Sequence, residues 1–286
     1  MMTSTGSGKH KIYFADTTEI KLDEKSISVL LLNSGVHPDV PPEDIRLYGY
    51  REQITWPDGS VAPGVLEPIC LWYIPTPTMK ILVDTGISPE NAAHANKVFR
   101  TRDQGQVYTT RPEHDIRKFL ASHGTTPEEI DVVILTHLHL DHFANAPAYT
   151  NARFIVQRRE LPWGLTPPPY AEFHWREFTP YLIDVLDRVE AVEGDVTICD
   201  GVEAWWVGGH TAGSQAVAVD TELGKVVLAG DFFYSYKNIE WNWPPGNYWS
   251  LDEWEQSSQR LRSDSDLIIP NHDYETFERY PRGYIG

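Results

Sequence analysis

The sequence predicts an α/β fold built in layers, and three observations support this prediction. Short apolar segments of strand length alternate with amphipathic segments along the 286 residues, which is the order expected of layered α/β domains. The composition, with 41% hydrophobic and 23% charged residues, is ordinary for a globular protein. No repeat, low-complexity tract or linker divides the chain. We therefore expect one domain over residues 1–286.

The first half of the chain is expected to contain strands, one helix and a buried strand that follows it. Four apolar segments are expected to be strands: 11–14, 27–32, 69–74 and 79–83. The apolar residues of 112–122 lie on one face of a helix, which Gly124 ends. Segment 131–135 is almost wholly apolar, as is typical of a strand covered on both faces.

The second half is expected to alternate strands with two irregular insertions. Prolines and large aromatic residues crowd the segments at about 158–180 and 241–249, and such proline density excludes long regular elements. Ser250 and Glu253 form a capping box for a helix that runs to about Arg262. Four further strands are expected: 203–207, 215–220, 225–229 and 267–269.

Charge and segment lengths limit the partners. The chain has 41 acidic and 24 basic residues, giving a formal charge of −17, and a field of that sign repels nucleic acids and anionic membranes. No apolar run approaches the roughly 18 residues that span a bilayer. The N-terminal segment lacks the apolar stretch of a signal peptide. We expect a cytoplasmic protein that binds a small molecule, with Cys70 and Cys199 as buried, reduced thiols.

A cluster of metal-ligand residue types follows the predicted strand 131–135. The segment THLHLDH contains His137, His139, Asp141 and His142, and imidazole nitrogen and carboxylate oxygen are ligands that zinc accepts. Alternate residues of an extended segment point the same way, so His137 and His139 can reach one ion. Asp141 and His142 lie beyond the end of the predicted strand and can turn toward a second ion.

Three more candidate ligands each follow a predicted strand. They are His210 in GGHTAGS, Asp231 at the end of VVLAGD, and His272 at the end of LIIPNH. Strand ends can meet at one edge of a sheet, so these side chains can converge on the first cluster. A carboxylate such as that of Asp231 can bridge two cations about 3.5–4 Å apart.

These motifs together resemble the metallo-β-lactamase superfamily of hydrolases. The matching pieces follow that family's order over about two-thirds of the chain: VDTG at 83–86, THLHLDH at 136–142, GHT at 209–211, GD at 230–231 and NH at 271–272. The resemblance implies a four-layer αβ/βα sandwich. Within the superfamily the sequence is most similar to the N-acyl-homoserine lactonases, because Tyr234 stands where those enzymes carry a tyrosine beside the metals.

The resemblance also implies two zinc sites. His137, His139 and His210 would hold the first zinc, and Asp141, His142 and His272 the second, with Asp231 bridging them. Asp84 would support the site without being a ligand. The sequence departs from the family pattern at 143–145, where Phe-Ala-Asn replaces a glycine-containing segment. Manganese, iron or cobalt can occupy similar nitrogen and oxygen sites, so the metal itself stays open.

The expected activity is hydrolysis of a lactone by hydroxide held between the two metals. Asp141 would orient this nucleophile, and the Tyr234 hydroxyl would polarise the carbonyl as part of an oxyanion hole. Another small electrophile, such as an isothiocyanate, cyclic amide or aryl ester, is an alternative substrate for the same site. A zinc-binding sensor without turnover is a second alternative.

The aromatic insertions suggest where further contacts are made. Five tryptophans lie in irregular segments: Trp163, Trp175, Trp241, Trp243 and Trp249. Large aromatic side chains in such segments either line a pocket for an apolar or aromatic part of the substrate or form a homodimer surface. At least one of Trp205 and Trp206, which lie in a predicted strand, is expected in the core.

Overall fold

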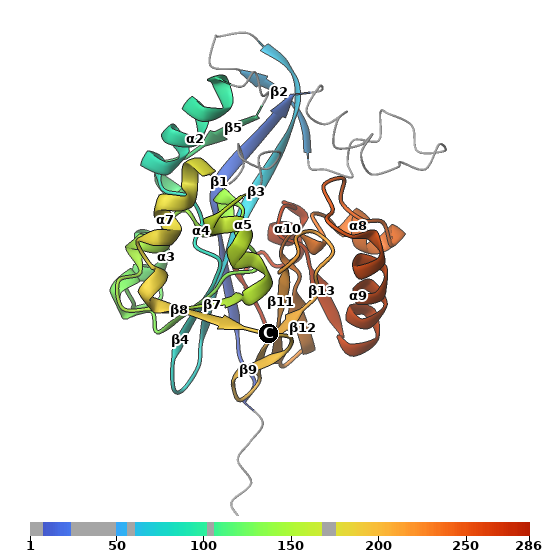
Figure 1. Ribbon diagram of the computed structural model, residues 1–286. Helices are drawn as coiled ribbons and strands as arrows, with labels where there is room; N and C mark the ends of the chain where they lie inside the picture. Colours follow the sequence, from blue (N-terminus) through green and yellow to red (C-terminus); the bar gives the residue numbers. More distant parts are fainter. Residues whose placement is uncertain (1–7, 24–49, 56–60, 102–105, 168–175) are drawn as a thin grey trace, which may run out of the picture.

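Two β-sheets form the centre of the molecule (Figure 1). The structure is a computed structural model that describes residues 8–23, 50–55, 61–101, 106–167 and 176–286. Within these residues the first sheet has the strand order β14-β1-β3-β4-β6-β7-β8, with β2 also paired to β3 and β5 to β1. Its strands are β1 (Ile12–Asp23), β2 (Tyr50–Thr55), β3 (Val61–Pro75), β4 (Lys80–Val83), β5 (Gln106–Thr109), β6 (Val132–Ile134), β7 (Arg153–Gln157), β8 (Val189–Val192) and β14 (Tyr284–Ile285).

The second sheet has the order β13-β12-β11-β10-β9. Its strands are β9 (Val196–Cys199), β10 (Val202–Trp206), β11 (Gln215–Thr221), β12 (Gly224–Leu228) and β13 (Leu267–Ile269). β12 and β13 are parallel, as are β4, β6, β7 and β8 in the first sheet. The carboxyl ends of the parallel strands therefore lie together at one edge of each sheet.

Alternating side chains pack the two sheets face to face. Val132 and Ile134 of β6 point into the core between the sheets, where they join Val217 of β11. Val133, between them, points to the opposite face and packs under the helices. Both faces of the central strands are thus buried, which explains why these segments are apolar without alternation.

Helices cover the outer face of each sheet, and this completes four layers, helix–sheet–sheet–helix (Figure 1). Ala95 and Phe99 of α2 and Leu120 of α3 pack on the first sheet, and Trp254 and Leu261 of α9 pack on the second. The helices are α2 (Pro89–Thr101), α3 (Ile116–Ser122), α4 (Leu140–Phe143), α5 (Leu161–Leu165), α7 (Thr179–Ile183), α8 (Tyr236–Trp241), α9 (Leu251–Asp264) and α10 (Glu275–Arg279). The predicted four-layer sandwich is confirmed.

Most predicted strands are found close to their expected bounds. Those at 69–74, 79–83, 131–135, 203–207, 215–220, 225–229 and 267–269 correspond to β3, β4, β6, β10, β11, β12 and β13. The strand at 11–14 is much longer than expected, because β1 continues through a bulge between Asp16 and Glu19 that shifts its register. The segment 27–32 lies outside the described residues. Trp205 is buried in the core beside α9, as predicted.

The two predicted helices need correction. The helix over 112–122 is interrupted, because Asp115 has an extended backbone and its side chain accepts the Arg117 N–H as the N-cap of α3. α9 begins after Ser250, whose hydroxyl accepts the Glu253 N–H at 3.2 Å. The Glu253 carboxylate turns instead to Arg159, at 3.0 Å. Only half of the predicted capping box is formed.

The two insertions are irregular, as predicted. The described part of 158–180 holds short helical turns, the five-residue α5 and the first two residues of α7, while 168–175 lie outside the described residues. No helix or strand occurs between the end of α8 and the start of α9. Both cysteines are free thiols, and Cys70 is buried but Cys199 is only half-buried.

Candidate metal centre

The predicted ligands meet at the side of the molecule where strands of both sheets end. His137 follows β6 in the first sheet, whereas Asp231 and His272 follow the parallel strands β12 and β13 of the second. Gly230 permits this approach: its backbone has φ +54°, and a Cβ there would lie 2.8 Å from the Thr136 Cβ. Glycine adopts this conformation without strain, so the GD motif brings the end of β12 against the end of β6.

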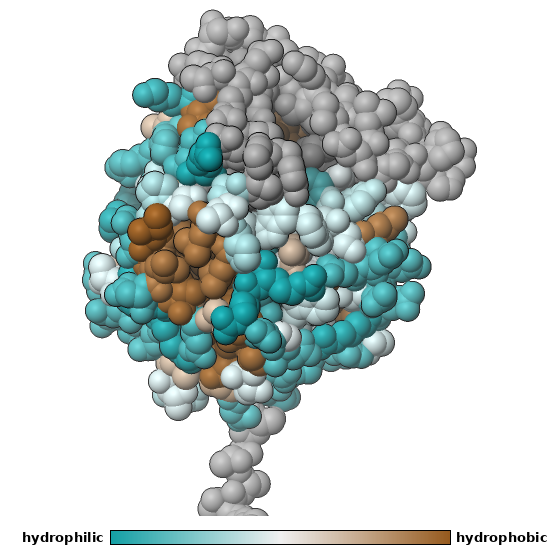
Figure 2. Space-filling view, in the orientation of Figure 1, coloured by the Kyte–Doolittle hydropathy of each residue, from teal (hydrophilic) through white to brown (hydrophobic). Residues whose placement is uncertain are grey.

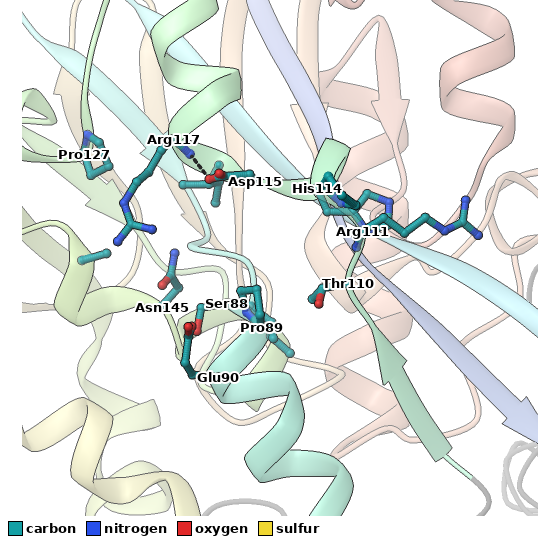
Figure 3. A pocket seen from close by; sticks show the side chains of 14 residues that line it. Ser88, Pro89, Glu90, Thr110, Arg111, His114, Asp115, Arg117, Pro127 and Asn145 are labelled. Carbon is teal, nitrogen blue, oxygen red and sulfur yellow. Dashed lines mark hydrogen bonds between the residues drawn. The ribbon is translucent and has the colours of Figure 1, made fainter. Parts of the chain in front are cut away.

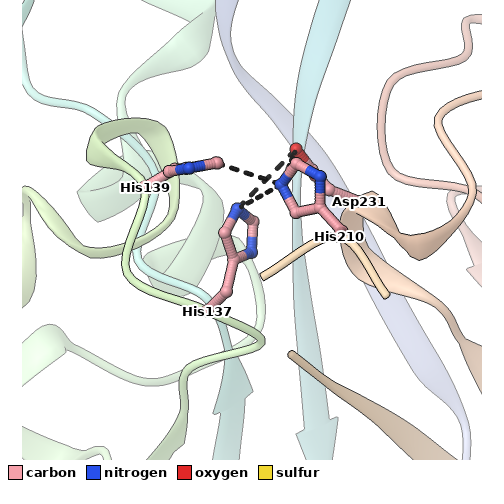
Figure 4. Close-up of side chains that lie close together, drawn as sticks. All are labelled: His137, His139, His210 and Asp231. Carbon is pink, nitrogen blue, oxygen red and sulfur yellow. Dashed lines mark hydrogen bonds and ion pairs between the residues drawn. The ribbon is translucent and has the colours of Figure 1, made fainter. Parts of the chain in front are cut away.

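Three histidines and Asp231 form the first group (Figure 4). The His210 Nε2 lies 3.2 Å from the His137 Nε2 and 3.0 Å from the His139 Nδ1. The Asp231 Oδ2 lies 3.7 Å from the His137 Nε2 and 3.5 Å from the His210 Nε2. All four ligand atoms are within 4.8 Å of one another, so they surround a space of the size that one metal ion needs.

Asp141, His142 and His272 form the second group on the other side of Asp231. The Asp141 Oδ2 lies 3.4 Å from the His142 Nε2 and 3.7 Å from the His272 Nε2. The Asp231 Oδ1 lies 3.1 Å from the His142 Nε2 and 3.0 Å from the His272 Nε2. One oxygen of Asp231 therefore faces each group, which is the arrangement of a bridging carboxylate.

The outer hydrogen bonds of the histidines show which nitrogen of each ring faces the ligand groups. The His210 Nδ1 contacts the Asn247 carbonyl at 2.8 Å, and the His272 Nδ1 contacts the Pro68 carbonyl at 2.8 Å. A carbonyl oxygen only accepts, so each Nδ1 donates and each Nε2 is left to face the ligand group. The His142 Nδ1 likewise donates to the Asp84 Oδ2, at 2.8 Å.

In the first group the Nε2 atoms of His137 and His210 face each other, and two lone pairs in such contact need a cation between them. In the second group the imidazole nitrogens face carboxylates, and either a proton or a metal ion can lie between them. The buried His142 Nε2 has no hydrogen bond among the described residues, although Asp231 lies beside it. Histidine ligands oriented by hydrogen bonds from their other nitrogen are typical of zinc sites, and the donor set of imidazole and carboxylate suits zinc. The residues therefore fit two metal ions.

The two groups differ in their protonation. Burial lowers the pKa of His210, and burial together with the neighbouring His142 lowers that of His137 well below its usual range. Burial also disfavours the charged form of His272, but Asp231 and then Asp141 outweigh it and raise the pKa of His272 to about 9. Asp231, in turn, has a strongly lowered pKa because the histidines around it overcome the effect of burial.

Asp84 orients a histidine of the second group and belongs to neither group. Its Oδ1 accepts the Thr136 N–H at 2.8 Å, and its Oδ2 accepts the Thr136 hydroxyl at 2.9 Å and the His142 Nδ1–H. The backbone of Asp84 is left-handed, with φ 60°. The segment 143–145, where the sequence departs from the family pattern, continues the short helix α4 in ordinary helical backbone at Ala144.

Tyr234 lies against both groups. Its ring centroid is 5.8 Å from that of His210 and 5.2 Å from that of His272. Its hydroxyl donates to the Asn247 Oδ1 at 2.7 Å. Asn247, from the second insertion, thus contacts a ligand through its carbonyl and the tyrosine through its side chain, a role that the sequence did not indicate.

A hollow of about 150 Å³ opens onto the two groups. Its lining combines polar and apolar side chains, among them Asp141, Tyr234, Glu67, Ile20 and Phe99. Burial raises the pKa of Glu67 to about 8, and sequence reasoning missed this buried carboxyl because no motif contains it. Trp163, Trp241, Trp243 and Trp249 are not among the described residues that line this hollow, so a homodimer surface, the other role expected for them, stays a prediction. Trp175 lies outside the described residues.

A larger cavity lies elsewhere and contains no residue of either group. It has a volume of about 350 Å³ and lies where α2 and α3 begin, with Ser88, Glu90, Arg111 and Arg117 in its lining (Figure 3). The volume of a cavity therefore does not locate the metal centre. The convergence of ligand atoms locates it.

The geometry of the fold and of the site agrees with a comparison of the sequence with protein families. Residues 71–272, which include every candidate ligand, match the metallo-beta-lactamase superfamily. The chain belongs to this superfamily and is a hydrolase of it. In the part of the chain that the structure describes, no helix is long and apolar enough to cross a membrane.

Curated relatives and solved structures carry the comparison further. The chain is 29% identical over 226 residues to the N-acyl homoserine lactonase AiiA of Bacillus thuringiensis subsp. kurstaki, covering 76% of this chain and 87% of that one. It is 30% identical over 229 residues to an N-acyl homoserine lactonase of Bacillus cereus, with the same coverage. An N-acyl homoserine lactone hydrolase, solved with the product N-hexanoyl-L-homoserine at its catalytic metal centre, shares the fold: TM-score 0.71, 24% identity, 98% of this chain and 100% of that one.

Proposed function

We propose that this protein is a dinuclear zinc lactonase that opens N-acyl-homoserine lactones. The observation that carries the proposal is the Asp231 carboxylate, which directs one oxygen to each of two ligand groups beside a hollow that Tyr234 lines. The names of the relatives support this substrate class. In bacterial signalling, such an activity would destroy the lactone signal.

The ligand roles follow from the two groups. We propose that His137, His139 and His210 hold the first zinc, that Asp141, His142 and His272 hold the second, and that Asp231 bridges them. Zinc, when bound, lowers the pKa of water toward neutrality and polarises a carbonyl oxygen. The protein supplies the ligand positions and the outer hydrogen bonds that orient each imidazole.

Tyr234 and Asp141 would act directly on the reacting groups. Burial and the nearby Asp231 hold the pKa of Tyr234 well above its usual value, so its hydroxyl stays protonated. During the reaction this hydroxyl would donate to the lactone carbonyl oxygen in place of the Asn247 Oδ1, and stabilise the negative charge that develops there. Asp141 would accept a hydrogen bond from the attacking water and so orient it.

The hollow suggests where the acyl chain lies. Ile20, Leu22 and Phe99 form an apolar part of its lining. Burial of each methylene of an acyl chain on such a surface contributes about 0.8 kcal/mol. We therefore expect longer acyl chains to lower KM until this surface is covered.

Proton release from an unbuffered lactone solution tests the function. Zinc-loaded protein should release one proton per N-decanoyl-homoserine lactone opened, and Tyr234→Phe should release it more slowly. Protein that binds two zinc ions but opens no lactone would contradict the substrate class, and isothiocyanates, cyclic amides and aryl esters would then be assayed. Failure with all of them would favour the sensor alternative.

We also propose that residues 1–286 are one domain, because the two sheets share one core.

We propose further that the protein forms a homodimer, because large apolar side chains are exposed. Trp241 and Trp249 are 43% and 47% exposed, and Leu251 is 46% exposed. Apolar side chains also gather over the region of α7 (Figure 2), where Ile183 is 56% exposed. Light scattering during gel filtration should give twice the chain mass, and a monomer would contradict the dimer.

A further inference from the structure

A buried carboxylate outside both ligand groups connects the loops of the first group. Glu160 follows β7 and is fully buried. Its Oε1 accepts the Leu138 N–H at 3.1 Å, and its Oε2 accepts the Thr211 hydroxyl and the Gly213 N–H, both at 2.8 Å. Both oxygens therefore accept hydrogen bonds, and all three partners are donors.

The three donors belong to loops that carry the histidines of the first group. Leu138 lies between His137 and His139, in the loop that follows β6 of the first sheet. Thr211 comes directly after His210, in the loop that follows β10 of the second sheet. One carboxylate thus joins loops from two sheets at the point where their side chains must share one metal ion.

We propose that Glu160 is a positioning residue that sets the spacing of His137, His139 and His210 and thereby the affinity of the first metal position. This inference rests on the proposed assignment of those histidines as ligands. Outer partners of ligands commonly change metal affinity by about 10- to 100-fold when they are lost. Glu160 bonds to the loops that carry the ligands and not to an imidazole, so it is one residue further from the metal position than such an outer partner.

The requirement at this position is for a carboxylate. Glutamine has the same shape, but its amide carries an NH₂ in place of one oxygen. Either orientation of that amide sets the NH₂ against a donor, the Leu138 N–H or the Gly213 N–H. Gly213 also has to be small, because a Cβ there would lie 2.6 Å from the Glu160 backbone nitrogen.

Stability alone does not account for Glu160. Burial of a carboxylate is unfavourable, and it raises the pKa of Glu160 above its usual value in spite of the three hydrogen bonds. Well-packed apolar side chains often replace buried charges without loss of stability. A buried charge that spans two ligand loops is therefore better explained by the geometry that it imposes on them.

Metal-binding measurements on matched variants test the inference. Glu160→Gln, and Thr211→Val as a second variant that removes one donor, are compared with the wild type by chelator competition for zinc and by the absorption spectrum of the cobalt-loaded protein. Ile74→Ala serves as the control. Ile74 is buried between the sheets and lies near the C-terminal end of β3, beyond the part of the strand where the Pro68 carbonyl contacts His272.

We expect Glu160→Gln to weaken the first zinc position by about 10- to 100-fold and to shift the cobalt absorption bands, with a smaller effect from Thr211→Val. Ile74→Ala should lower the unfolding temperature but leave both metal readouts unchanged. The inference is overturned if both test variants lose only thermal stability. Wild-type protein that binds no zinc would overturn the proposed function, and this inference with it, whereas wild-type binding with unchanged variants overturns the inference alone.

Discussion

The two ligand groups on either side of Asp231 are built differently. The first is an array of three imidazoles, in which His137 and His210 have lowered pKa values and are neutral at pH 7. In the second, His142 and His272 face carboxylates, which raise their pKa values against the effect of burial. Without metal, the first group offers lone pairs to a cation, while the second holds protons in the places that a cation would take.

This difference predicts two unequal metal positions. An ion entering the first group meets the neutral imidazoles of His137 and His210, whereas an ion entering the second has to displace protons. Asp231 is expected to couple the two positions because one oxygen of its carboxylate faces each group. Substitution of Asp231 should therefore lower the metal affinity of both positions, whereas substitution of any other ligand should lower that of one position.

The largest effect is expected from Asp231→Ala, which removes both bridging oxygens. Metal content should fall, and kcat/KM should fall by far more than the roughly 100-fold that loss of an outer partner causes. Metal analysis after dialysis, together with the lactone assay, measures both quantities. Full zinc content with an unchanged rate would show that Asp231 does not bridge the ions.

Tyr234→Phe should reduce kcat by roughly 100-fold, the effect of losing one oxyanion donor. Tyr234 is not in either ligand group, so both zinc ions should stay bound. Steady-state kinetics on protein of known zinc content make the comparison. A rate equal to that of the wild type would leave the tyrosine with a packing role only.

The pH dependence of zinc binding should separate the two groups. The pKa of His272 is raised to about 9, so it holds its proton at pH 7 and releases it as the pH rises past 9. Affinity at the second position should therefore increase by up to about 100-fold between pH 7 and pH 9 for each proton displaced. The first position should change little, because burial lowers the pKa values of His137 and His210 and both are already neutral at pH 7. Chelator competition over this range measures both, and equal slopes would contradict the distinction.

Asp84→Asn should have the smallest effect and should be confined to the second group. The charge that orients His142 is removed, while an oxygen that can accept a hydrogen bond remains, so we expect about a 10-fold loss of affinity there. Glu160→Gln is the counterpart at the first group. If both variants weakened the same position, the division of the site into two groups would be wrong.

The sequence predicted the convergence of the ligands because each one directly follows an apolar segment of strand length. His137, Asp231 and His272 each stand three residues beyond the end of a strand that the structure confirms. The supporting residues could not be found in this way. Glu160 and Asn247 act on ligands that are distant in the chain, and only the approach of separate loops reveals their hydrogen bonds.

The fold was predicted least well where polar residues lie inside regular elements. The segment 15–19 of β1 holds Asp16 and Glu19, which the bulge accommodates, and polar residues of this kind obscure strand alternation. α2 was missed because polar residues interrupt its apolar positions, and only Ala92, Ala95, Val98 and Phe99 pack in the core. The resemblance to a known family supplied the layer order that local patterns could not.

Anomalous diffraction at the zinc absorption edge, from crystals grown with zinc, tests the central claim most directly. Two peaks should appear, one between the Asp231 carboxylate and the three histidines of the first group, and one between the same carboxylate and the second group. A single peak, or peaks that Asp231 does not contact, would contradict a dinuclear centre bridged by this residue.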